Sequence, residues 1–238
     1  MLSVEELDYR YYKGRPDWQD GTTRYRKLVE DATRGTERVL DIGPGTGETF
    51  CHSLKGKVGE FIGLDPHPAV EENDDLDRGI VGSIVEIPFP EEHFDVVVSS
   101  FALEHIEQPR AGLRELHRVL RPGGRFVFRT PNVWHYVGLI SRLTPQWFHN
   151  LFAHRARGLP PEHEEPHPTY YCFNSLSRIR TICEEVGFDV ELLQGVEAEP
   201  SYMRFNSLAF LLGLGYERFV NSSERFSGLR AFFLGVLR

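Results

Sequence analysis

The apolar positions of this chain form short continuous runs that alternate with amphipathic segments. The runs 39–42, 60–65 and 94–99 are rich in β-branched and aromatic residues, as in strands buried on both faces. Between 109 and 120 the leucines and valines recur at the three- and four-residue spacing of a helix with one buried face. Buried strands that alternate with helices predict an α/β fold with a mostly parallel sheet.

The same patterns, with glycine and proline as breaks, predict the remaining elements. Helices are expected at 22–32, 48–54, 133–143, 175–186 and 204–215, and strands at 79–83, 125–130, 188–193 and 229–237. Asn174 is expected to cap the helix 175–186 and Gly187 to end it. The run Arg121–Gly124 is expected to be a turn between the helix 109–120 and the next strand.

Length and irregular segments predict the domain organisation. A chain of 238 residues suits a single domain, 1–238. Residues 1–34, ahead of the first strand, are expected to form an N-terminal lid helix region. The proline-, histidine- and aromatic-rich stretch 133–173 is expected to be a cap insertion that faces the substrate, since long insertions tend to be lids. Residues 204–238 are expected to supply the last helix and the final strand.

Composition narrows the class of protein. A net charge of −8 argues against a nucleic-acid partner, which would require clustered lysine and arginine. Three cysteines without metal-like spacing, a charged N-terminus and no apolar run long enough to cross a bilayer predict a cytoplasmic protein. The apolar tail 205–237 allows peripheral membrane contact, but a core helix followed by a strand is the simpler explanation. The oligomeric state stays open.

A glycine-rich loop follows the first strand. Three glycines alternate with other residues in Asp41-Ile42-Gly43-Pro44-Gly45-Thr46-Gly47, where positive φ angles would let a ligand lie against bare backbone. Ligands in open α/β sheets bind at this end of the strands. A dinucleotide fingerprint would need its third glycine at position 48, which is Glu48, and an acid beside a pyrophosphate is unfavourable. The loop therefore fits a nicotinamide cofactor poorly.

Two motifs resemble a known family. The Asp-x-Gly-x-Gly-x-Gly loop resembles motif I of the class I S-adenosylmethionine-dependent methyltransferases. The run 94–106, which ends in Leu-Glu-His-Ile, resembles motif IV of the type 11 methyltransferases of the small-molecule branch. The resemblance is specific over 39–130. It implies a doubly wound, seven-stranded Rossmann-like sheet with an antiparallel last strand, and S-adenosylmethionine as the cofactor.

The resemblance also implies cofactor-binding residues. The methionine end would lie on the first loop, the ribose at the end of the second strand, the adenine after the third and the floor after the fourth. The residues for the methionine end are Asp41, Gly43, Pro44, Gly45 and Gly47, and those for the ribose are Asp65 and Pro66. The residues for the adenine are Ser83 and Ile84, and the floor of the site would consist of Ser100, Phe101 and Ala102. An acid after the second strand suits ribose hydroxyls of any adenosine cofactor, and a helix N-cap is the alternative for Asp65. The chain departs from the family at 82–84, where an aspartate is usual.

Histidines are the candidates for proton transfer. His105, past the fourth strand, can remove a proton from an attacking atom or can order its loop, and His135 is a second candidate. His149, His154, His163 and His167 match no metal-ligand spacing. Glu104 and His105 match two ligands of a divalent-ion site in quinone-pathway relatives, but Phe101 stands in the first place. We expect no metal.

The function that these features predict is methyl transfer from S-adenosylmethionine to an oxygen, nitrogen or carbon nucleophile of a small, partly apolar acceptor. Two alternatives stay open. A non-catalytic protein could bind the same cofactor with the same fold. A nicotinamide-dependent reductase is the less favoured alternative, because it would need the third glycine of the loop at position 48.

Overall fold

The computed structural model describes residues 2–47, 54–143 and 168–238. Contacts between residues group the described chain into two compact units. The sheet unit comprises 22–47, 54–131, 168–194 and 233–238, and the helical unit comprises 2–21, 132–143 and 195–232. The single domain expected for 1–238 stays a prediction.

The sheet unit is organised around a seven-stranded sheet with the order β3-β2-β1-β4-β5-β7-β6. Its strands are β1 (Arg38–Ile42), β2 (Glu60–Asp65), β3 (Arg78–Val81), β4 (Phe94–Ser100), β5 (Leu120–Pro131), β6 (Val190–Val196) and β7 (Phe232–Leu237). The first five strands pair in parallel, and antiparallel pairing occurs at the last strands. The expected Rossmann-like, mostly parallel sheet is confirmed.

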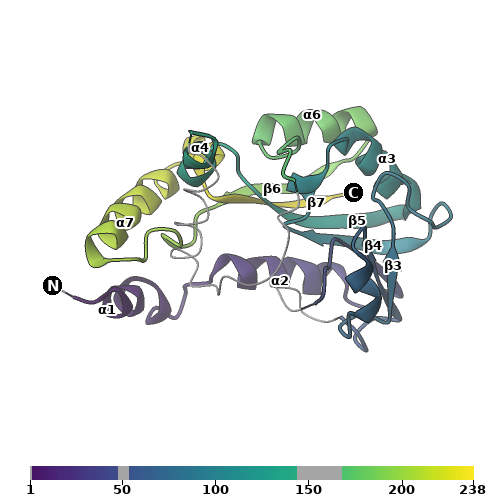
Figure 1. Cartoon of the computed structure of the whole chain (residues 1–238), viewed down its shortest axis with the longest axis horizontal. Coiled ribbons are helices and arrows are strands. Elements are labelled where there is room, and N and C mark those ends of the chain that lie inside the picture. The colour runs from purple at the N-terminus through teal and green to yellow at the C-terminus, as the bar shows by residue number, and fades with distance from the viewer. Residues whose placement is uncertain (1, 48–53, 144–167) are drawn as a thin grey trace. The chain divides into compact units, whose positions relative to one another are not determined.

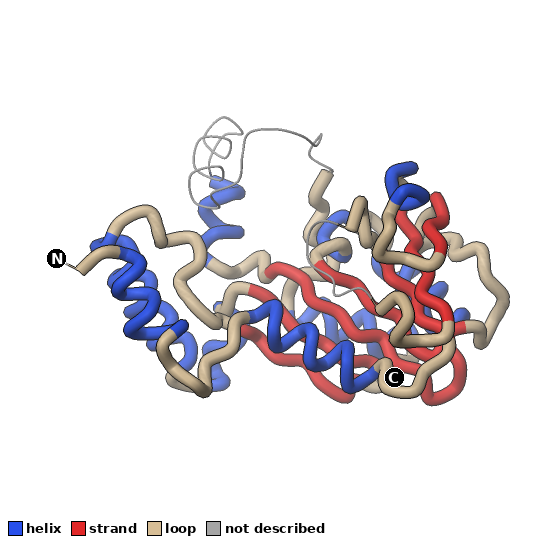
Figure 2. The backbone as a smooth tube through the Cα atoms, turned by 90° about the horizontal axis from the view of Figure 1, so that it is seen from below, coloured by secondary structure: helices blue, strands red, loops and turns tan. Residues whose placement is uncertain are grey.

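Helices cover both faces of this sheet (Figure 1). On one face lie α3 (Pro109–Val119) and α6 (Leu176–Val186), and on the other lies α2 (Gly21–Ala32). Figure 2 views the sheet from the α2 side and shows a helix lying across the strands. Such covering of both faces explains why the strands read as continuous apolar runs rather than as an alternating pattern.

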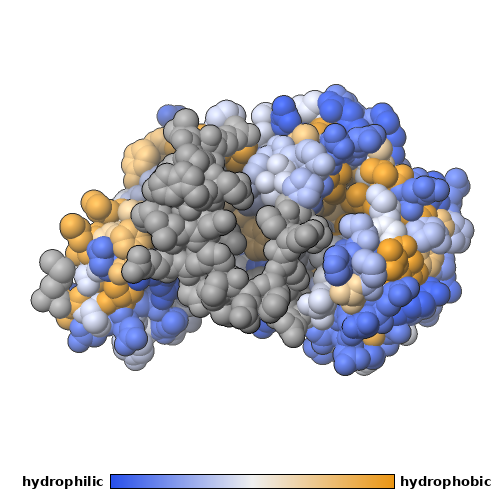
Figure 3. Space-filling view, in the orientation of Figure 1, coloured by the Kyte–Doolittle hydropathy of each residue, from blue (hydrophilic) through white to orange (hydrophobic). Residues whose placement is uncertain are grey.

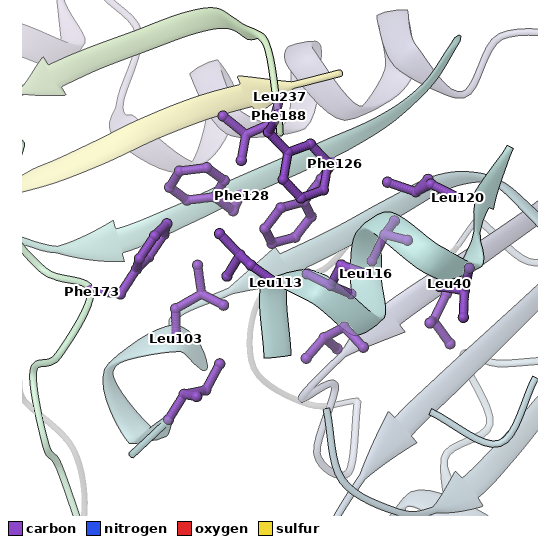
Figure 4. Close-up of a cluster of buried hydrophobic side chains, with 14 of the residues drawn as sticks. Leu40, Leu103, Leu113, Leu116, Leu120, Phe126, Phe128, Phe173, Phe188 and Leu237 are labelled. Carbon is purple, nitrogen blue, oxygen red and sulfur yellow. The ribbon is translucent and has the colours of Figure 1, made fainter. Parts of the chain in front are cut away.

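The core on the α3 and α6 face is rich in aromatic and leucine side chains (Figure 4). Leu113 and Leu116 of α3 are fully buried against Phe126 and Phe128 of β5. The two phenylalanine rings are stacked with their centroids 5.2 Å apart. Burying a leucine or phenylalanine side chain stabilises a fold by about 1.5–3 kcal/mol, so this layer fixes how β5 sits beside β4.

The strand β5 is longer than the sequence predicts. Leu120 pairs with Phe94 of β4, and the register shifts before Arg125 pairs with Val96. The expected turn Arg121–Gly124 is therefore wrong, because these residues form an irregularity inside the strand. Gly123 supplies a φ of +81° there, and the Arg121 guanidinium binds the Asp95 carboxylate at 2.7 Å.

The elements after β5 begin later than expected, and each shift has a local cause. In α6 the cap is Ser175, whose Oγ accepts from the Arg178 N–H, so the prediction of Asn174 is wrong. Gly187 ends α6 with a φ of +98°, and the Phe188 N–H bonds to the Cys183 carbonyl. Phe188 is thus held by the helix end, and β6 starts at Val190 rather than at 188.

The helical unit contains α1 (Val4–Asp8), a following helical turn (Tyr9–Lys13), α4 (Tyr136–Leu143), α7 (Ser207–Asn221) and a short helix (Glu224–Leu229). Leu7, Tyr12 and Phe210 form a small buried cluster. Both α7 and β7 begin three residues later than expected, at Ser207 and Phe232. None of the helices described is long and apolar enough to cross a membrane.

Two expectations lie outside the described residues. The helix predicted at 48–54 falls almost entirely in 48–53, and most of the cap predicted at 133–173 falls in 144–167. The described part of that cap begins with a turn, in which the Asn132 Oδ1 accepts from the Trp134 N–H. For that reason α4 starts at Tyr136 rather than at 133.

Candidate functional site

The residue pairing of the parallel strands brings the ends of β1, β2, β4 and β5 to one edge of the sheet. Ile42 at the end of β1 pairs with Leu64 of β2 and with Ser99 of β4. Ser100 in turn pairs with Arg129 of β5. The loops that follow these strands therefore start side by side at the carboxyl edge. Because β2 and β4 lie on opposite sides of β1, this edge includes the point where the strand order reverses, which is where ligands bind in such sheets.

All three glycines of the first loop lie in the left-handed region, which glycine adopts more readily than other residues. Their φ angles are +73° at Gly43, +59° at Gly45 and +88° at Gly47. A Cβ at Gly43 would also overlap the Ala102 side chain, and one at Gly47 would lie 2.5 Å from the Asn73 Oδ1. The loop thus exposes backbone where side chains would otherwise fill the space, as the sequence predicts.

Asp41, at the end of β1 just before this loop, is a buried acid with an unpartnered oxygen and a raised pKa. It is 1% exposed, and its Oδ1 has no hydrogen-bond partner among the described residues. Burial, with the nearby Asp65 charge adding to it, raises the pKa of the Asp41 carboxyl to about 8. An unpaired buried carboxyl is costly unless a partner arrives. A cationic ligand would provide such a partner, and in this respect the residues fit the methionine end of S-adenosylmethionine.

Asp65 connects the ends of β1 and β2. One carboxylate oxygen accepts from the Gly45 N–H at 3.1 Å and the other from the His67 N–H at 2.8 Å. The second bond closes a turn across Pro66, whereas the N-cap of the following short helix (Pro68–Glu72) is His67, so the helix N-cap that was the alternative for Asp65 is wrong. Asp65 is 9% exposed, so its carboxylate is close to the surface of the edge, where a diol could compete for it.

Asn73 completes the loop, and sequence reasoning missed it. Its side-chain N–H₂ donates to the Gly45 carbonyl at 3.0 Å, and its Oδ1 accepts from the Asp75 N–H at 2.9 Å. Gly45 is therefore held on both sides, by Asp65 at its N–H and by Asn73 at its carbonyl. No spacing rule marks Asn73, because its position depends on how the 66–77 segment folds back.

The predicted adenine residues follow β3. Ser83 is exposed, and its Oγ accepts weakly from the Val85 N–H at 3.4 Å, while Ile84 is half-buried. The Gly82 N–H bonds to the Asp65 carbonyl at 3.0 Å, which places this turn beside the end of β2. Ser83 and Ile84 thus lie at the same edge as Asp65, and their contact with adenine stays a prediction.

The predicted floor follows β4 and is held by a buried arginine. Phe101 has a φ of +55°, which is uncommon for a residue other than glycine, and its N–H bonds to the Arg129 carbonyl. The Arg129 guanidinium, 2% exposed, donates to the Ser100 Oγ at 2.7 Å and lies 4.6 Å from the Phe101 ring centroid. On its other side Arg129 approaches the Tyr25 ring, at 4.9 Å. These contacts hold Ser100 and Phe101 in place next to Ala102 and Gly43.

Sequence reasoning missed Arg129, although a signal for it exists. An arginine within the apolar run Arg125-Phe126-Val127-Phe128-Arg129-Thr130 is anomalous for a strand buried on both faces. Thr22 and Tyr25 of α2 also take part, since the Arg129 Nη1 donates to the Thr22 Oγ1 at 3.0 Å.

His105 belongs to the sheet unit and follows the floor residues. Its Nδ1 lies 2.9 Å from the Pro168 carbonyl oxygen, which can only accept a hydrogen bond. Nδ1 therefore carries the proton in the neutral ring, and Nε2 is the nitrogen that can take up another. The contact also ties the loop after β4 to the start of the segment before α6, as the ordering role requires. A catalytic role for His105 stays a prediction.

His135 lies in the helical unit and is 2% exposed. Its Nε2 is 3.3 Å from the Glu197 Oε2, and the rings of Tyr136 and Tyr216 lie against it with centroids at 4.0 and 5.6 Å. Among the described residues neither the His135 Nε2 nor the Glu197 Oε2 has a hydrogen-bond partner, so the two groups are in contact without a hydrogen bond between them. A proton-transfer role for His135 stays a prediction.

Among the residues that the structure describes, no group of three or more histidine, cysteine or acidic side chains is arranged to hold an ion. The four histidines at 149, 154, 163 and 167 lie outside the described residues.

Known proteins of similar sequence indicate the family. A model of the family described as "Methyltransferase domain" matches residues 12–193. The ubiquinone/menaquinone biosynthesis C-methyltransferase UbiE of Shewanella sp. (strain ANA-3) is 36% identical over 117 residues, which are 44% of this chain and 46% of that protein. The chain thus spans about half the length of the curated relatives it matches.

Solved structures share the fold. An S-adenosylmethionine-dependent methyltransferase from Mesorhizobium loti superposes with a TM-score of 0.57 at 18% identity, covering 90% of this chain and 95% of that one. The [4+2]-cyclase SpnF reaches the same TM-score at 15% identity, covering 96% and 85%. The family match extends over more than half of the chain, and the family and fold imply S-adenosylmethionine as the cofactor. The chain belongs to the methyltransferase domain family and has the fold of the class I S-adenosylmethionine-dependent methyltransferases.

Proposed function

We propose that this protein transfers the methyl group of S-adenosylmethionine to an oxygen, nitrogen or carbon nucleophile of a small, partly apolar molecule. The observation that carries the proposal is the loop of three positive-φ glycines above the buried, unpartnered Asp41 carboxyl oxygen. That pairing of bare backbone with an uncompensated acid suits a cationic amino-acid group, whereas it would repel a diphosphate.

The residues that would hold the cofactor all belong to the sheet unit. Asp41 and the glycine loop would bind the methionine end, Asp65 the ribose hydroxyls, and Ser83 with Ile84 the adenine. Ser100, Phe101 and Ala102 would form the floor. Asp65 would exchange its bonds to the Gly45 and His67 N–H groups, in part, for bonds to the ribose.

When bound, the cofactor supplies a methyl group already activated by its sulfonium. The chain's own task is then to align the acceptor and to exclude water, and alignment alone can contribute roughly 7–11 kcal/mol to lowering a barrier. His105 is the group we assign to proton removal, at Nε2, since Nδ1 is occupied by the Pro168 carbonyl. An acceptor whose nucleophile ionises easily would need no such base.

The chemistry of the acceptor is proposed from two sources. The similar UbiE protein is named for ubiquinone and menaquinone biosynthesis, which are quinone pathways. In addition, the segment expected to face the acceptor is rich in aromatic residues. Both favour a ring-containing, partly apolar small molecule over a protein or a nucleic acid.

Isothermal calorimetry with S-adenosylhomocysteine tests the cofactor assignment. We expect one site per chain, and no heat from NADH at the same concentrations. An Asp41→Asn variant, which keeps the shape but loses the charge, should bind more weakly. Tight NADH binding, with none of S-adenosylhomocysteine, would instead support the nicotinamide-dependent reductase.

A panel of acceptors tests catalysis. Radiolabelled S-adenosylmethionine is offered with phenols, amines and demethylated quinones, and transfer to at least one class is expected. Cofactor binding without transfer to any acceptor, with Asp41→Asn as the matched background, favours the non-catalytic alternative. The structurally similar SpnF protein is named a [4+2]-cyclase, so a protein with this fold need not be a methyltransferase.

A further inference from the structure

Asn73 is a buried residue in a segment whose other polar residues are mostly exposed. Glu71, Glu72, Asp74 and Asp77 are exposed, whereas Asn73 is 6% exposed. The surface near β3, at the lower right of Figure 3, is mostly hydrophilic. A polar side chain that turns from such a surface into the interior needs hydrogen-bond partners there.

The side chain of Asn73 finds these partners in two places. Its Oδ1 accepts from the Asp75 N–H at 2.9 Å, which is a local bond that shapes the turn at 73–75. Its Nδ2 donates to the Gly45 carbonyl at 3.0 Å, across 28 positions of the chain. A Cβ at Gly47 would lie 2.5 Å from the Asn73 Oδ1, so the amide group is also packed closely against the glycine loop.

The segment that carries Asn73 is anchored by contacts that do not involve the loop. The Lys55 Nζ donates to the Leu76 carbonyl at 2.8 Å, and the Leu76 side chain is 3% exposed. Asp77 is bound to Phe61 of β2 twice, because its N–H donates to the Phe61 carbonyl and its Oδ2 accepts from the Phe61 N–H, each at 2.8 Å. Asn73 therefore reaches the loop from a support that β2 holds in place.

A second bond holds Gly45 and would change when the cofactor binds. The Gly45 N–H donates to the Asp65 Oδ2 at 3.1 Å. Under the proposed function, on which this step depends, Asp65 turns in part to the ribose hydroxyls and releases Gly45. Asn73 contacts the carbonyl of Gly45 rather than its N–H, so its bond is compatible with that exchange.

We propose that Asn73 is a positioning residue for the cofactor, which holds the Gly45 carbonyl, and with it the glycine loop, while Asp65 binds the ribose. Asn73 acts through the loop and not by contact with the cofactor. The part of the cofactor that depends on Asn73 is then the amino-acid group, because the loop is where that group would bind. The adenine and the ribose would depend on it much less.

Calorimetry with two ligands tests this role. S-adenosylhomocysteine has the amino-acid group, whereas 5′-methylthioadenosine has the adenine, the ribose and the sulfur without it. We expect Asn73→Ala to bind S-adenosylhomocysteine about three- to tenfold more weakly, which is the effect of losing one neutral hydrogen bond. Its affinity for methylthioadenosine should stay within about twofold of wild type. A general loss of structure would instead lower both affinities.

The variant Asn73→Ser separates the two bonds of the side chain. A serine hydroxyl can accept from the N–H two residues on, as in a serine turn, but it is too short to reach Gly45. We expect Asn73→Ser to regain part of the thermal stability that Asn73→Ala loses. Its binding of S-adenosylhomocysteine should stay as weak as that of Asn73→Ala.

Asn132 provides a matched control. It is 3% exposed, its Nδ2 donates to the carbonyls of Gly228 and Arg230, and its Oδ1 accepts from the N–H two residues on, that of Trp134. None of these bonds involves the glycine loop. Asn132→Ala should therefore lower the melting temperature and leave the affinities for both ligands unchanged.

The possible results distinguish this role from the proposed function. Absence of S-adenosylhomocysteine binding by folded wild type would overturn both. If wild type binds, the role of Asn73 alone would be overturned by an Asn73→Ala variant that loses affinity for both ligands equally or for neither. Wild-type affinity for S-adenosylhomocysteine in Asn73→Ser would also overturn it, because the local turn rather than the bond to Gly45 would then be what matters.

Discussion

At the scale of single residues, the candidate site is governed by two acids at neighbouring strand ends. Asp41 is buried without a partner for its Oδ1, and Asp65 is satisfied by two backbone N–H groups. Burial raises the pKa of Asp41 to about 8. At neutral pH the Asp41 carboxyl therefore favours its protonated form, and a cationic ligand beside it would favour the ionised form.

The pH dependence of stability should reveal Asp41. Below its unfolded pKa of 3.8 both states hold the proton, and between 3.8 and about 8 only the folded state does. The unfolded state binds fewer protons across this window, so Asp41 makes the folded state progressively less stable as the pH rises toward 8. Urea unfolding of the ligand-free protein from about pH 5 to 9 should show a steeper decline for wild type than for Asp41→Asn. Parallel curves would contradict the prediction.

The affinity for S-adenosylhomocysteine should also depend on the ionisation of Asp41. Its ammonium favours ionised Asp41, so binding should tighten as the pH rises from about 6 to 8, by up to about tenfold per unit. The Asp41→Asn variant should bind more weakly and with a flat profile. Calorimetry across this range provides the measurement, and an equally flat wild-type profile would count against contact between Asp41 and the ammonium.

Replacing Asp65 should separate binding from folding. Asp65→Ala removes the proposed ribose partner, and loss of charged hydrogen bonds of about 1.5–3 kcal/mol each predicts weaker S-adenosylhomocysteine binding by at least about tenfold. The matched control is Asp95→Asn, because Asp95 also accepts from two backbone N–H groups, those of Glu37 and Arg38, but at the opposite edge of the sheet. That variant should lose stability and keep its affinity. Unchanged affinity in Asp65→Ala would refute the ribose assignment.

At the scale of elements, the sequence predicts the elements themselves well and their ends less well. Buried strands and amphipathic helices follow from side-chain periodicity, which is local information. Ends depend on contacts that periodicity does not contain. Asn174 is a good capping residue by type, yet its side chain donates to the Thr130 Oγ1 and the Pro131 carbonyl across the sheet unit. Ser175 therefore takes the cap.

This exchange of roles predicts an order of stability losses. Ser175→Ala should cost about 1 kcal/mol, as removal of a cap does, and Asn174→Ala about 2–3 kcal/mol because two buried acceptors lose their donor. Ser177→Ala, on the exposed side of the first turn, should stay within about 0.5 kcal/mol of wild type. Urea unfolding gives all three values. A larger loss for Ser175→Ala than for Asn174→Ala would restore the original assignment.

Arg129 holds the loop after β4 through contacts that a local sequence pattern does not predict. Arg129→Lys keeps a charge but not the planar group that bonds Ser100 and Thr22 and lies between two aromatic rings. We expect a loss of about 2–4 kcal/mol in the free energy of unfolding and weaker S-adenosylhomocysteine binding. Arg125→Lys, whose side chain forms an exposed ion pair with Glu191, is the control and should change neither by much. Wild-type affinity in Arg129→Lys would show that the floor residues hold their positions without it.

At the scale of the whole molecule, the sequence predicts those parts of the candidate site that depend on the glycine loop and on the order of the parallel strands. The strand order brings the ends of β1, β2 and β4 together, so Asp41, Asp65 and Ser100 could be placed from the sequence alone. Asn73 and Arg129 could not, because their partners are 28 and 29 positions away and depend on how the chain folds back. The contact between His105 and the Pro168 carbonyl could not be predicted either, because it depends on where the segment before α6 lies.

Ligand-linked stability tests the molecule as a unit. A ligand that binds only the folded state adds about 2.7 kcal/mol at a hundredfold excess over its dissociation constant. S-adenosylhomocysteine should therefore raise the melting temperature by several degrees, and NADH at equal concentration should not. Differential scanning fluorimetry measures both, and equal shifts would argue for binding through the adenosine alone.

The place of β7 in the strand order has a consequence for biosynthesis. β7 lies between β5 and β6, although it is the last strand along the chain, so β6 has no strand to pair with until 232–237 has been made. During translation the sheet therefore stays incomplete beyond β5. The contacts that complete it join segments that are far apart in the sequence. Such long-range pairing is slow. The growing polypeptide would therefore reach its final shape only after translation has passed the last strand.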